Sequence, residues 1–341
     1  MKVLCFGELL LRLSSPGYNR LFQKDSLDAT FCGGEANVAV SLSNFGINSE
    51  FVTKLPNNDV GMAAEKSLKY FGVNTDKIVY GDGRMGLYYL EKGASQRPSK
   101  VIYDRAYSVI AMADKSEFDW NKIFDGVDWF HWTGINPALG DNVAEICELA
   151  CKAAKSKGII ISCDLNFRKN LWTSKKAQSV MKRLMPYVDV CIANEEDADK
   201  VLGIKASDTD VENGELSFSG YKKVAEEICT TYGCEKVAIT LRKSYSASRN
   251  GWSGLIYDGK TGECVHSTEY DIQIVDRVGG GDSFTAGVIY GIIKRMTDKE
   301  TVEFAAAASC LKHTVEGDFN RVTVQDVKSL LQNGGNGRVQ R

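Results

Sequence analysis

The sequence predicts an α/β fold with a central, mainly parallel sheet and helices on both faces. Two observations lead to this prediction: short apolar runs alternate with segments of helical periodicity, and the alternation covers most of the chain. The chain has 341 residues, 43% of them hydrophobic, which is enough for one large core or two smaller ones. We find neither an internal repeat nor a linker that demands a second domain, so we predict a single domain over residues 1–330.

The expected elements follow in chain order. A strand at 1–7, a helix at 35–44 closed by Gly46, a strand at 51–55 and a helix at 61–71 come first. From residue 129 we expect strands at 129–132, 159–163, 188–193 and 236–241, with helices at 141–156, 175–185, 195–202 and 221–232. A hairpin at 252–257 and 263–267 turns through Asp258-Gly259, and helices follow at 283–294, 300–312 and 324–331.

Residues 12–32 and 84–108 depart from this alternation. Both segments have an extended pattern, with strands at 86–91 and 100–105, and we expect them to form a small accessory sheet or lid. Residues 205–219 are polar and acidic, which indicates an exposed loop, and residues 331–341 have the composition of a disordered tail.

Composition narrows the classes of partner. The net charge of −2 gives no basic footprint for nucleic acid or for an anionic membrane, and no apolar run reaches the length of a membrane span. The ten cysteines are scattered through apolar runs, form no CxxC pair and follow no signal peptide. Reduced, mostly buried thiols in a cytoplasmic protein are the interpretation that this pattern favours.

Three consecutive glycines, Gly279, Gly280 and Gly281, are followed directly by Asp282 and a helical segment. Because glycines have no side chain, their N–H groups can surround an anion, and the helix N-terminus adds donors and a positive dipole end. An aspartate would repel a phosphate that is merely bound, but it fits phosphoryl transfer if it accepts the proton of the attacking hydroxyl. The alternative is a glycine-rich turn capped by Asp282.

A second glycine cluster lies near the N-terminus. Gly33 and Gly34 precede the helix expected at 35–44, and Asn37 lies in its first turn. Close backbone approach at Gly34 and the Asn37 amide suit the hydroxyl groups of a polar ligand, while a simple turn and helix cap is the alternative. A formal phosphate-loop pattern at 254–261 is rejected, because such a loop must follow a strand and open a helix, whereas this one spans a hairpin.

These two clusters, near opposite ends of an alternating chain, resemble the ribokinase-like (PfkB) family of carbohydrate kinases. Gly33-Gly-Glu-Ala-Asn-Val-Ala39 is similar to the family's N-terminal signature, and Asp276-Arg-Val-Gly-Gly-Gly-Asp-Ser-Phe284 to its C-terminal one. The resemblance implies a three-layer α/β/α fold with a small β lid, which often makes a homodimer. It also implies ATP and Mg²⁺ as cofactors, Gly279 to Gly281 as an anion hole and Asp282 as catalytic base. A monovalent cation near the glycines stays open.

Within the family, the chain is most similar to the 2-keto-3-deoxygluconate kinases, through Leu11-Arg-Leu13, Phe130 to Ala138 and Asp164-Leu-Asn-Phe-Arg168. This implies phosphorylation of the C6 hydroxyl of 2-keto-3-deoxygluconate. Arg105 would hold the carboxylate of the acid, unless it is a solvated lid residue or pairs locally. The implied substrate contacts are Gly33, Gly34, Asn37, Tyr88, Tyr103, Arg105 and Asp318, and the nucleotide contacts are Asn166, Arg168, Thr240 and Arg242; strand packing is the alternative for the two tyrosines.

Two departures from the family pattern leave details open. The segment Arg242 to Ser248 replaces the usual Gly-x-x-Gly turn, and Asn194-Glu-Glu-Asp197 ends in aspartate, so the choice between Glu196 and Asp197 for Mg²⁺ stays open. A fructokinase or another sugar kinase of the family, a non-catalytic sugar-acid-binding protein and a nucleotide-binding scaffold remain alternatives. The sequence does not separate the gluconate from the galactonate epimer.

Overall fold

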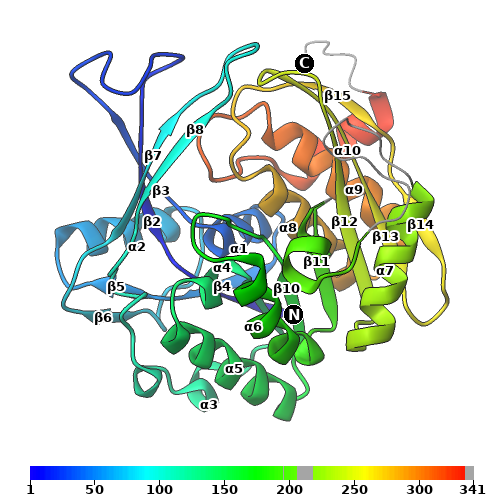
Figure 1. Ribbon diagram of the computed structural model, residues 1–341, viewed down its shortest axis with the longest axis horizontal. Helices are drawn as coiled ribbons and strands as arrows, with labels where there is room; N and C mark the ends of the chain where they lie inside the picture. Colours follow the sequence, from blue (N-terminus) through cyan, green and yellow to red (C-terminus); the bar gives the residue numbers. More distant parts are fainter. Residues whose placement is uncertain (195, 206–217, 335–341) are drawn as a thin grey trace.

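The structure, a computed structural model, describes residues 1–194, 196–205 and 218–334. Its centre is a nine-stranded sheet with the order β14-β13-β12-β11-β10-β9-β1-β4, in which β15 also pairs with β13 (Figure 1). The strands are β1 Lys2–Phe6, β4 Asn48–Val52, β9 Trp129–Thr133, β10 Ile160–Asp164, β11 Val190–Ala193, β12 Lys236–Ser244, β13 Arg249–Asp258, β14 Cys264–His266 and β15 Tyr270–Gln273. The pairs from β4 to β12 are parallel and those that β13 makes are antiparallel, which confirms the predicted mainly parallel sheet.

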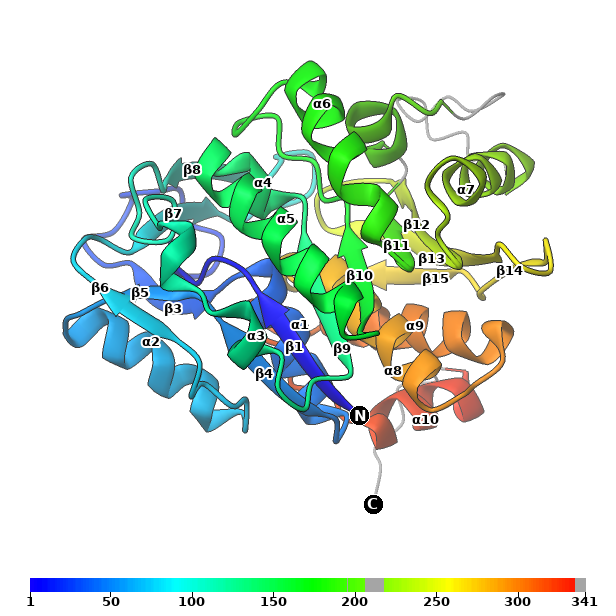
Figure 2. The same cartoon turned by 90° about the horizontal axis from the view of Figure 1, so that it is seen from below.

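Helices cover both faces of this sheet and produce two separate cores (Figure 2). One face packs against α3 Trp120–Ile123, α5 Asp141–Ser156, α6 Ser174–Leu184 and α7 Phe218–Tyr232, and the other against α1 Gly34–Asn44, α2 Asp59–Tyr70, α8 Gly280–Ile293, α9 Asp298–Lys312 and α10 Val324–Asn333. Alternation along β1 explains the division, because Leu4 and Phe6 enter the first core while Val3 and Cys5 enter the second. The predicted three-layer architecture is confirmed.

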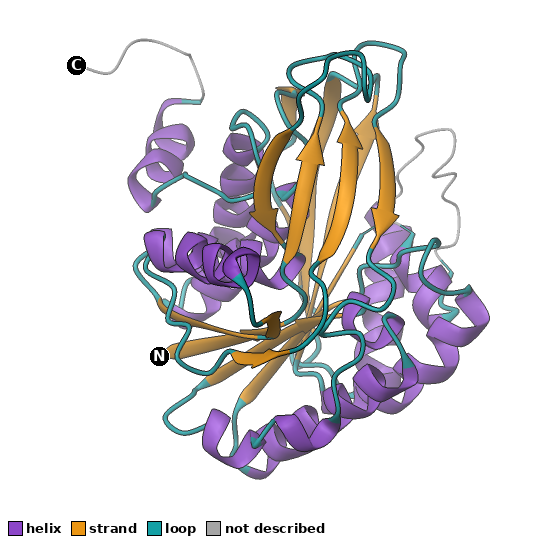
Figure 3. Ribbon diagram, turned by 90° about the vertical axis from the view of Figure 1, so that its left-hand side faces the viewer, coloured by secondary structure: helices purple, strands orange, loops and turns teal. Residues whose placement is uncertain are grey.

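A second sheet of four strands stands apart from this body, as Figure 3 shows. Its order is β3-β2-β7-β8, with β3 Asp28–Cys32, β2 Leu10–Ser14, β7 Gly86–Glu91 and β8 Lys100–Asp104. Both segments set apart by the sequence, 12–32 and 84–108, contribute strands to it. A short parallel pair, β5 Lys54–Pro56 with β6 Val79–Gly81, forms a separate two-stranded sheet.

Several expected elements differ in the structure. The strand expected at 51–55 is divided, because β4 pairs with β1 while β5 pairs with β6. The helix expected at 195–202 is a single π-helical turn, Ala198–Leu202. Just before that turn, the Asn194 and Asp197 side chains accept hydrogen bonds from the backbone N–H groups of Asn194, Glu196 and Asp197, and these bonds compete with a regular helix.

The ends of other segments also shift. Helix α8 begins at Gly280 rather than at 283, and β13 is longer than its predicted strand, running unbroken through the rejected phosphate-loop pattern as far as Asp258. Helix α10 continues to Asn333, beyond the expected start of the tail. Residues 335–341 and most of the expected acidic loop, 206–217, lie outside the described residues.

All ten cysteines are free, and seven of them are buried, as their apolar sequence contexts predict. Among the helices that the structure describes, none combines the length and the apolar character needed to cross a bilayer.

Candidate active site

A cavity of about 380 Å³ lies where the parallel strands end. Asp164 and Ala193, the last residues of β10 and β11, line it from the central sheet. The predicted substrate contacts Gly33, Gly34, Asn37, Tyr88, Tyr103, Arg105 and Asp318 all line this cavity, and so do the predicted nucleotide contacts Asn166, Arg168, Thr240 and Arg242. The loops after parallel strands are the usual position of ligand sites in open α/β sheets, so the cavity is the candidate active site.

The glycine triplet forms the N-terminal turn of α8. Gly279 is the N-cap with φ +81°, a left-handed conformation, and a Cβ atom there would lie 2.4 Å from the carbonyl oxygen of Asp318. Gly280 and Gly281 belong to the helix itself, which corrects the expectation of a loop before it. Gly281 lines the cavity with open space around it, whereas Gly280 packs against the ring of His313. The first-turn N–H groups that an anion needs are therefore at the cavity.

Asp282 brings the two signature motifs together. It lies in the first turn of α8, and its Oδ2 accepts a hydrogen bond of 2.6 Å from Nδ2 of Asn37, in α1. A Cβ atom added to Gly34 would lie 3.7 Å from Oδ1 of Asp282. Burial raises the pKa of Asp282 to about 6, although Asn37 and Arg168 act in the opposite direction. A carboxylate with this pKa is suited to accept a proton near neutral pH.

Arg105 is buried and already paired. Its Nε donates to Oε2 of Glu8 over 2.8 Å, and its Nη2 contacts the same oxygen. Only 5% of Arg105 is exposed, so the alternative of a solvated lid residue is wrong, and its partner is Glu8. A carboxylate ligand at Arg105 would have to share the guanidinium with Glu8.

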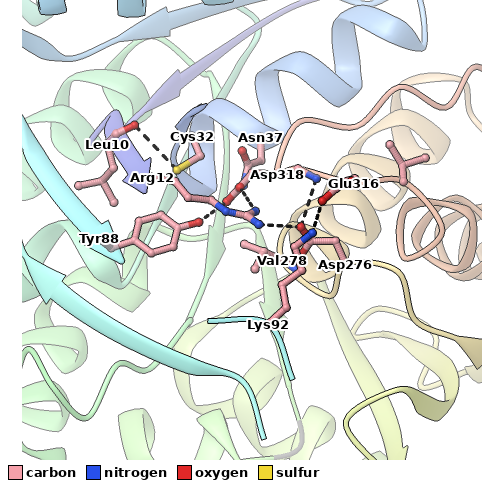
Figure 4. Close-up of polar contacts among 12 residues, drawn as sticks. Leu10, Arg12, Cys32, Asn37, Tyr88, Lys92, Asp276, Val278, Glu316 and Asp318 are labelled. Atoms are coloured by element: carbon pink, nitrogen blue, oxygen red, sulfur yellow. Dashed lines mark hydrogen bonds and ion pairs between the residues drawn. The ribbon is translucent and has the colours of Figure 1, made fainter. Parts of the chain in front are cut away.

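Arg12 connects the four-stranded sheet to the glycine turn, a contact that the sequence analysis missed. Figure 4 shows its guanidinium between Asp318, 2.5 Å from Nη1, and Asp276, 2.8 Å from Nη2. The hydroxyl of Tyr88 donates to the other oxygen of Asp318 over 2.7 Å. Both oxygens of Asp318 therefore bond to the chain. A charged residue between Leu11 and Leu13 in an apolar strand was the available signal.

Comparisons with known proteins agree with this geometry. The chain matches the model of the pfkB family carbohydrate kinases over residues 1–323. The chain belongs to the PfkB family of carbohydrate kinases. It is similar to the structure of 2-dehydro-3-deoxygluconokinase from Thermotoga maritima, with 50% identity and a TM-score of 0.94, covering 98% of this chain and 100% of that one. A PfkB family carbohydrate kinase from Listeria grayi is 35% identical, with a TM-score of 0.90 and coverage of 98% and 100%. The 2-dehydro-3-deoxygalactonokinase of Haloferax volcanii is 30% identical over 98% of both chains.

The protein is thus an enzyme that transfers a phosphoryl group to a carbohydrate, and the kinases of this family use ATP. On the strand-end side of its cavity lie two carboxylates, Asp164 and Asp197. Burial raises the pKa of Asp164 well above its ordinary value, and the nearby charges of Asp197 and Asp282 raise it further. Asp164 is the first residue of the motif Asp164-Leu-Asn-Phe-Arg168, and no role was predicted for it from the sequence.

Asp197 rather than Glu196 faces the cavity of this kinase. Its two oxygens accept hydrogen bonds from the N–H groups of Phe167 and Asn194, at 3.0 and 3.1 Å, while Glu196 is exposed. Among the described residues, no three His, Cys, Asp or Glu side chains cluster into a ready-made metal site. Asp164 and Asp197 fit Mg²⁺ that arrives with nucleotide phosphates and keeps several of its waters.

The segment after Leu241, which departs from the family pattern, is a long hairpin. Strand β12 continues to Ser244 and pairs with β13 back to Asn250. The Thr240 hydroxyl is directed to the carbonyl of Ala193, 3.5 Å away, and Arg242 lies over the ring of Trp252 at 5.2 Å. Arg277, to which the sequence analysis gave no role, also lines the cavity of the kinase.

Proposed function

We propose that the enzyme transfers the γ-phosphoryl group of ATP to the C6 hydroxyl of 2-keto-3-deoxygluconate. The observation on which this rests is Asp282, held by Asn37 in the first turn of α8 at the cavity. The names of the Thermotoga maritima and Haloferax volcanii relatives support a 2-keto-3-deoxy sugar acid as acceptor, and they differ between its gluconate and galactonate epimers.

In the proposed reaction, the C6 hydroxyl donates a hydrogen bond to Asp282. As the hydroxyl oxygen attacks the γ-phosphorus, the proton passes to Asp282 and the bond between the γ-phosphorus and the bridging oxygen of ADP breaks. The backbone N–H groups of Gly279, Gly280 and Gly281, together with the positive end of α8, stabilise the charge that develops on the phosphoryl oxygens. The pKa of about 6 for Asp282 keeps it ionised at neutral pH.

The nucleotide would lie along the strand ends, against Asn166, Arg168, Thr240 and Arg242. Mg²⁺ bound with it would neutralise phosphate charge near Asp164 and Asp197, held mostly through water. A monovalent cation beside the glycine turn would have to share Asp276, whose carboxylate accepts from Arg12, Val278 and Gly317. We therefore expect activity without added potassium, and a loss of turnover in potassium-free buffer would contradict this.

The sugar acid would lie under the four-stranded sheet, between Tyr88, Tyr103 and Arg105. Arg105 has five N–H donors in a planar fork, so it can bind the substrate carboxylate while Glu8 fixes its orientation. Closure of the sheet over the sugar would exclude water, which competes with the sugar as phosphoryl acceptor.

The same pairing gives a specific reason to keep a second acceptor class. With Glu8 bound to Arg105, the cavity already contains a neutralised guanidinium, and a neutral sugar such as fructose would need no further cation. This favours a fructokinase as the runner-up function.

The outer face of the four-stranded sheet suggests a homodimer. Strand alternation places Tyr88 and Tyr103 toward the cavity and leaves a mostly apolar outer face, which carries the charged Asp104 opposite Leu87 and otherwise consists of Leu11, Leu13, Ala29, Phe31, Leu87, Tyr89 and Ile102. Ile102 is 42% exposed. A second copy of the chain would cover this face, and light scattering of the purified protein would detect the dimer.

The test is an ADP-release assay with ATP and Mg²⁺ on 2-keto-3-deoxygluconate, its galactonate epimer, fructose and ribose. We expect kcat/KM for the two keto acids to exceed that for fructose and ribose by about a hundredfold or more. A preference for fructose would reject the sugar-acid proposal while keeping Asp282 as base. No turnover with any of the four would mean that the acceptor of this kinase lies outside the panel.

A further inference from the structure

Two arginines at the glycine-turn side of the cavity have no hydrogen-bonded acidic partner within the part of the chain that the structure describes. Arg242 comes from β12 and Arg277 from the segment between β15 and α8, and both line the cavity. The Nε atom of each is buried without a hydrogen-bond partner anywhere in residues 1–194, 196–205 and 218–334. Arg12 and Arg105, in contrast, are each bonded to buried carboxylates.

The groups around the two arginines do not neutralise them. The carboxylate nearest in sequence, Asp276, already accepts from Arg12, Val278 and Gly317. Arg242 lies over Trp252, and Trp252 packs against His313 with ring centroids 4.9 Å apart. His313 supplies no negative charge, and burial together with the nearby arginines and Lys312 lowers its pKa to about 4.

The two cations also repel each other. Burial lowers the pKa of Arg277, and the charge of Arg242 lowers it further, although the charge of Asp276 acts in the opposite direction. Partly buried like charges raise the free energy of the folded protein unless an anion lies between them. The geometry therefore favours a negatively charged ligand.

The N-terminal turn of α8 adds positive potential beside the same two arginines. Gly280, in that turn, packs so closely on His313 that an added Cβ atom would lie 2.4 Å from its ring, and His313 contacts the Trp252 ring under Arg242. Arg277 lies two residues before the N-cap of α8. Two independent sources of positive potential, a helix N-terminus and an arginine pair, thus meet beside the glycine turn.

We propose that Arg242 and Arg277 together bind the phosphate chain of the nucleoside triphosphate. A polyphosphate carries several negative charges, and its oxygens match the planar fork of a guanidinium. The carboxylate of the sugar acid has a separate arginine, Arg105 with Glu8, below the four-stranded sheet. This proposal rests on the kinase function proposed above and assigns a role to Arg277, which the mechanism does not otherwise use.

The experiment is calorimetric titration of four probes: Mg²⁺–ATP, inorganic tripolyphosphate, adenosine and 2-keto-3-deoxygluconate. The variants are Arg277→Gln, Arg242→Gln and the double substitution. Arg249→Gln is the matched control, because Arg249 pairs with Asp271 on the surface, where 58% of its side chain is exposed. We expect each single variant to bind Mg²⁺–ATP and tripolyphosphate about tenfold to a hundredfold more weakly, while its affinities for adenosine and the keto acid stay unchanged.

The double variant tests whether the two arginines share one anion. A shared site gives a combined loss smaller than the product of the single losses, since the second substitution acts on a contact already weakened. Thermal denaturation without ligand gives a second readout: Arg277→Gln should melt at the same or a higher temperature, because one repelling charge is gone. If Arg277 had a purely structural role, the Arg277→Gln variant would melt at a lower temperature and would bind all four probes more weakly.

Unchanged tripolyphosphate affinity in Arg277→Gln would overturn the proposal, and so would a loss confined to the keto acid. If Arg277→Gln does not fold, Arg277→Lys keeps the charge but loses the fork, and the proposal requires it to bind tripolyphosphate more weakly than the unmodified protein. If tripolyphosphate binding depends on the two arginines but the enzyme phosphorylates no sugar acid, only the proposed acceptor is wrong.

Discussion

Two pairs of arginines around the active site differ in how their charges are balanced. In the first pair, Arg12 lies between Asp276 and Asp318, and Arg105 is bonded to Glu8. In the second pair, Arg242 and Arg277 have no hydrogen-bonded carboxylate among the described residues. The difference separates charges that stabilise the fold from charges left for a ligand. Removing an arginine of the first pair should cost stability, and removing one of the second should cost binding.

Asp282 belongs to neither arginine pair, and its substitution should have the largest effect. Asp282→Asn removes the base but keeps a side chain that Asn37 can contact, so we expect turnover to fall by about a thousandfold or more with ATP affinity little changed. Single-turnover kinetics and nucleotide titration on the same protein measure the two quantities.

The same variant should not be less stable. Because the folded pKa of Asp282, about 6, is above its ordinary value of 3.8, its charge costs stability at neutral pH; that cost decreases as pH falls below 6 and is gone below 3.8. Asp282→Asn should therefore melt at the same or a higher temperature at pH 7. Near-normal turnover in this variant would reject Asp282 as the base.

Arg12→Met tests how much the buried contacts of Arg12 with Asp276 and Asp318 stabilise the fold. The substitution leaves Asp276 and Asp318 buried without their guanidinium, and we expect a loss of about 3–5 kcal/mol in the free energy of unfolding. Urea denaturation measures it, with Arg249→Met as control, where the exposed pair with Asp271 should contribute under about 1 kcal/mol. Equal losses in both variants would mean that the buried Arg12 contacts stabilise the fold no more than an exposed ion pair does.

Arg105→Ala tests whether the paired Arg105 also binds the carboxylate of the substrate. We expect the KM for 2-keto-3-deoxygluconate to rise by about tenfold to a hundredfold, while the weak activity with fructose changes far less. Glu8→Gln is the control, since it disturbs the same buried pair but keeps the arginine. If both variants weaken the keto acid equally, Arg105 acts through the fold rather than on the carboxylate.

The pH profile gives the smallest effect. With the pKa of Asp282 at about 6, kcat/KM should be level above pH 7 and should fall about tenfold per unit well below pH 6, because only the ionised carboxylate accepts the proton. Glu35, whose pKa is raised by burial to about 7, does not line the cavity, so Glu35→Gln should retain this limb. If Glu35→Gln abolished the fall of kcat/KM at low pH, the titrating group would be Glu35 and not Asp282.

How far the sequence predicts this site depends on where each contact comes from. The glycine turn, Asp282, Gly34 and Asn37 lie within local motifs, so the residues at the cavity were found without the structure. Arg12 was missed because its partners, Asp318 and Asp276, are 306 and 264 positions away. No local pattern records such a pairing.

The same limit applies to Arg105 and Arg277. Whether Arg105 is paired depends on Glu8, 97 residues away. That Arg277 has no hydrogen-bonded carboxylate among the described residues depends on every element packed around it, which a sequence does not show. The short turn at 198–202 was predicted too long for a different reason, since Asn194 and Asp197 bond local backbone groups instead of allowing a helix.

NMR of the product made from ATP and 2-keto-3-deoxygluconate would show directly which hydroxyl accepts the phosphoryl group. We expect one new phosphate ester whose phosphorus couples to the two protons on C6. A phosphate on any other carbon, or no ester under conditions where fructose is phosphorylated, would contradict this expectation.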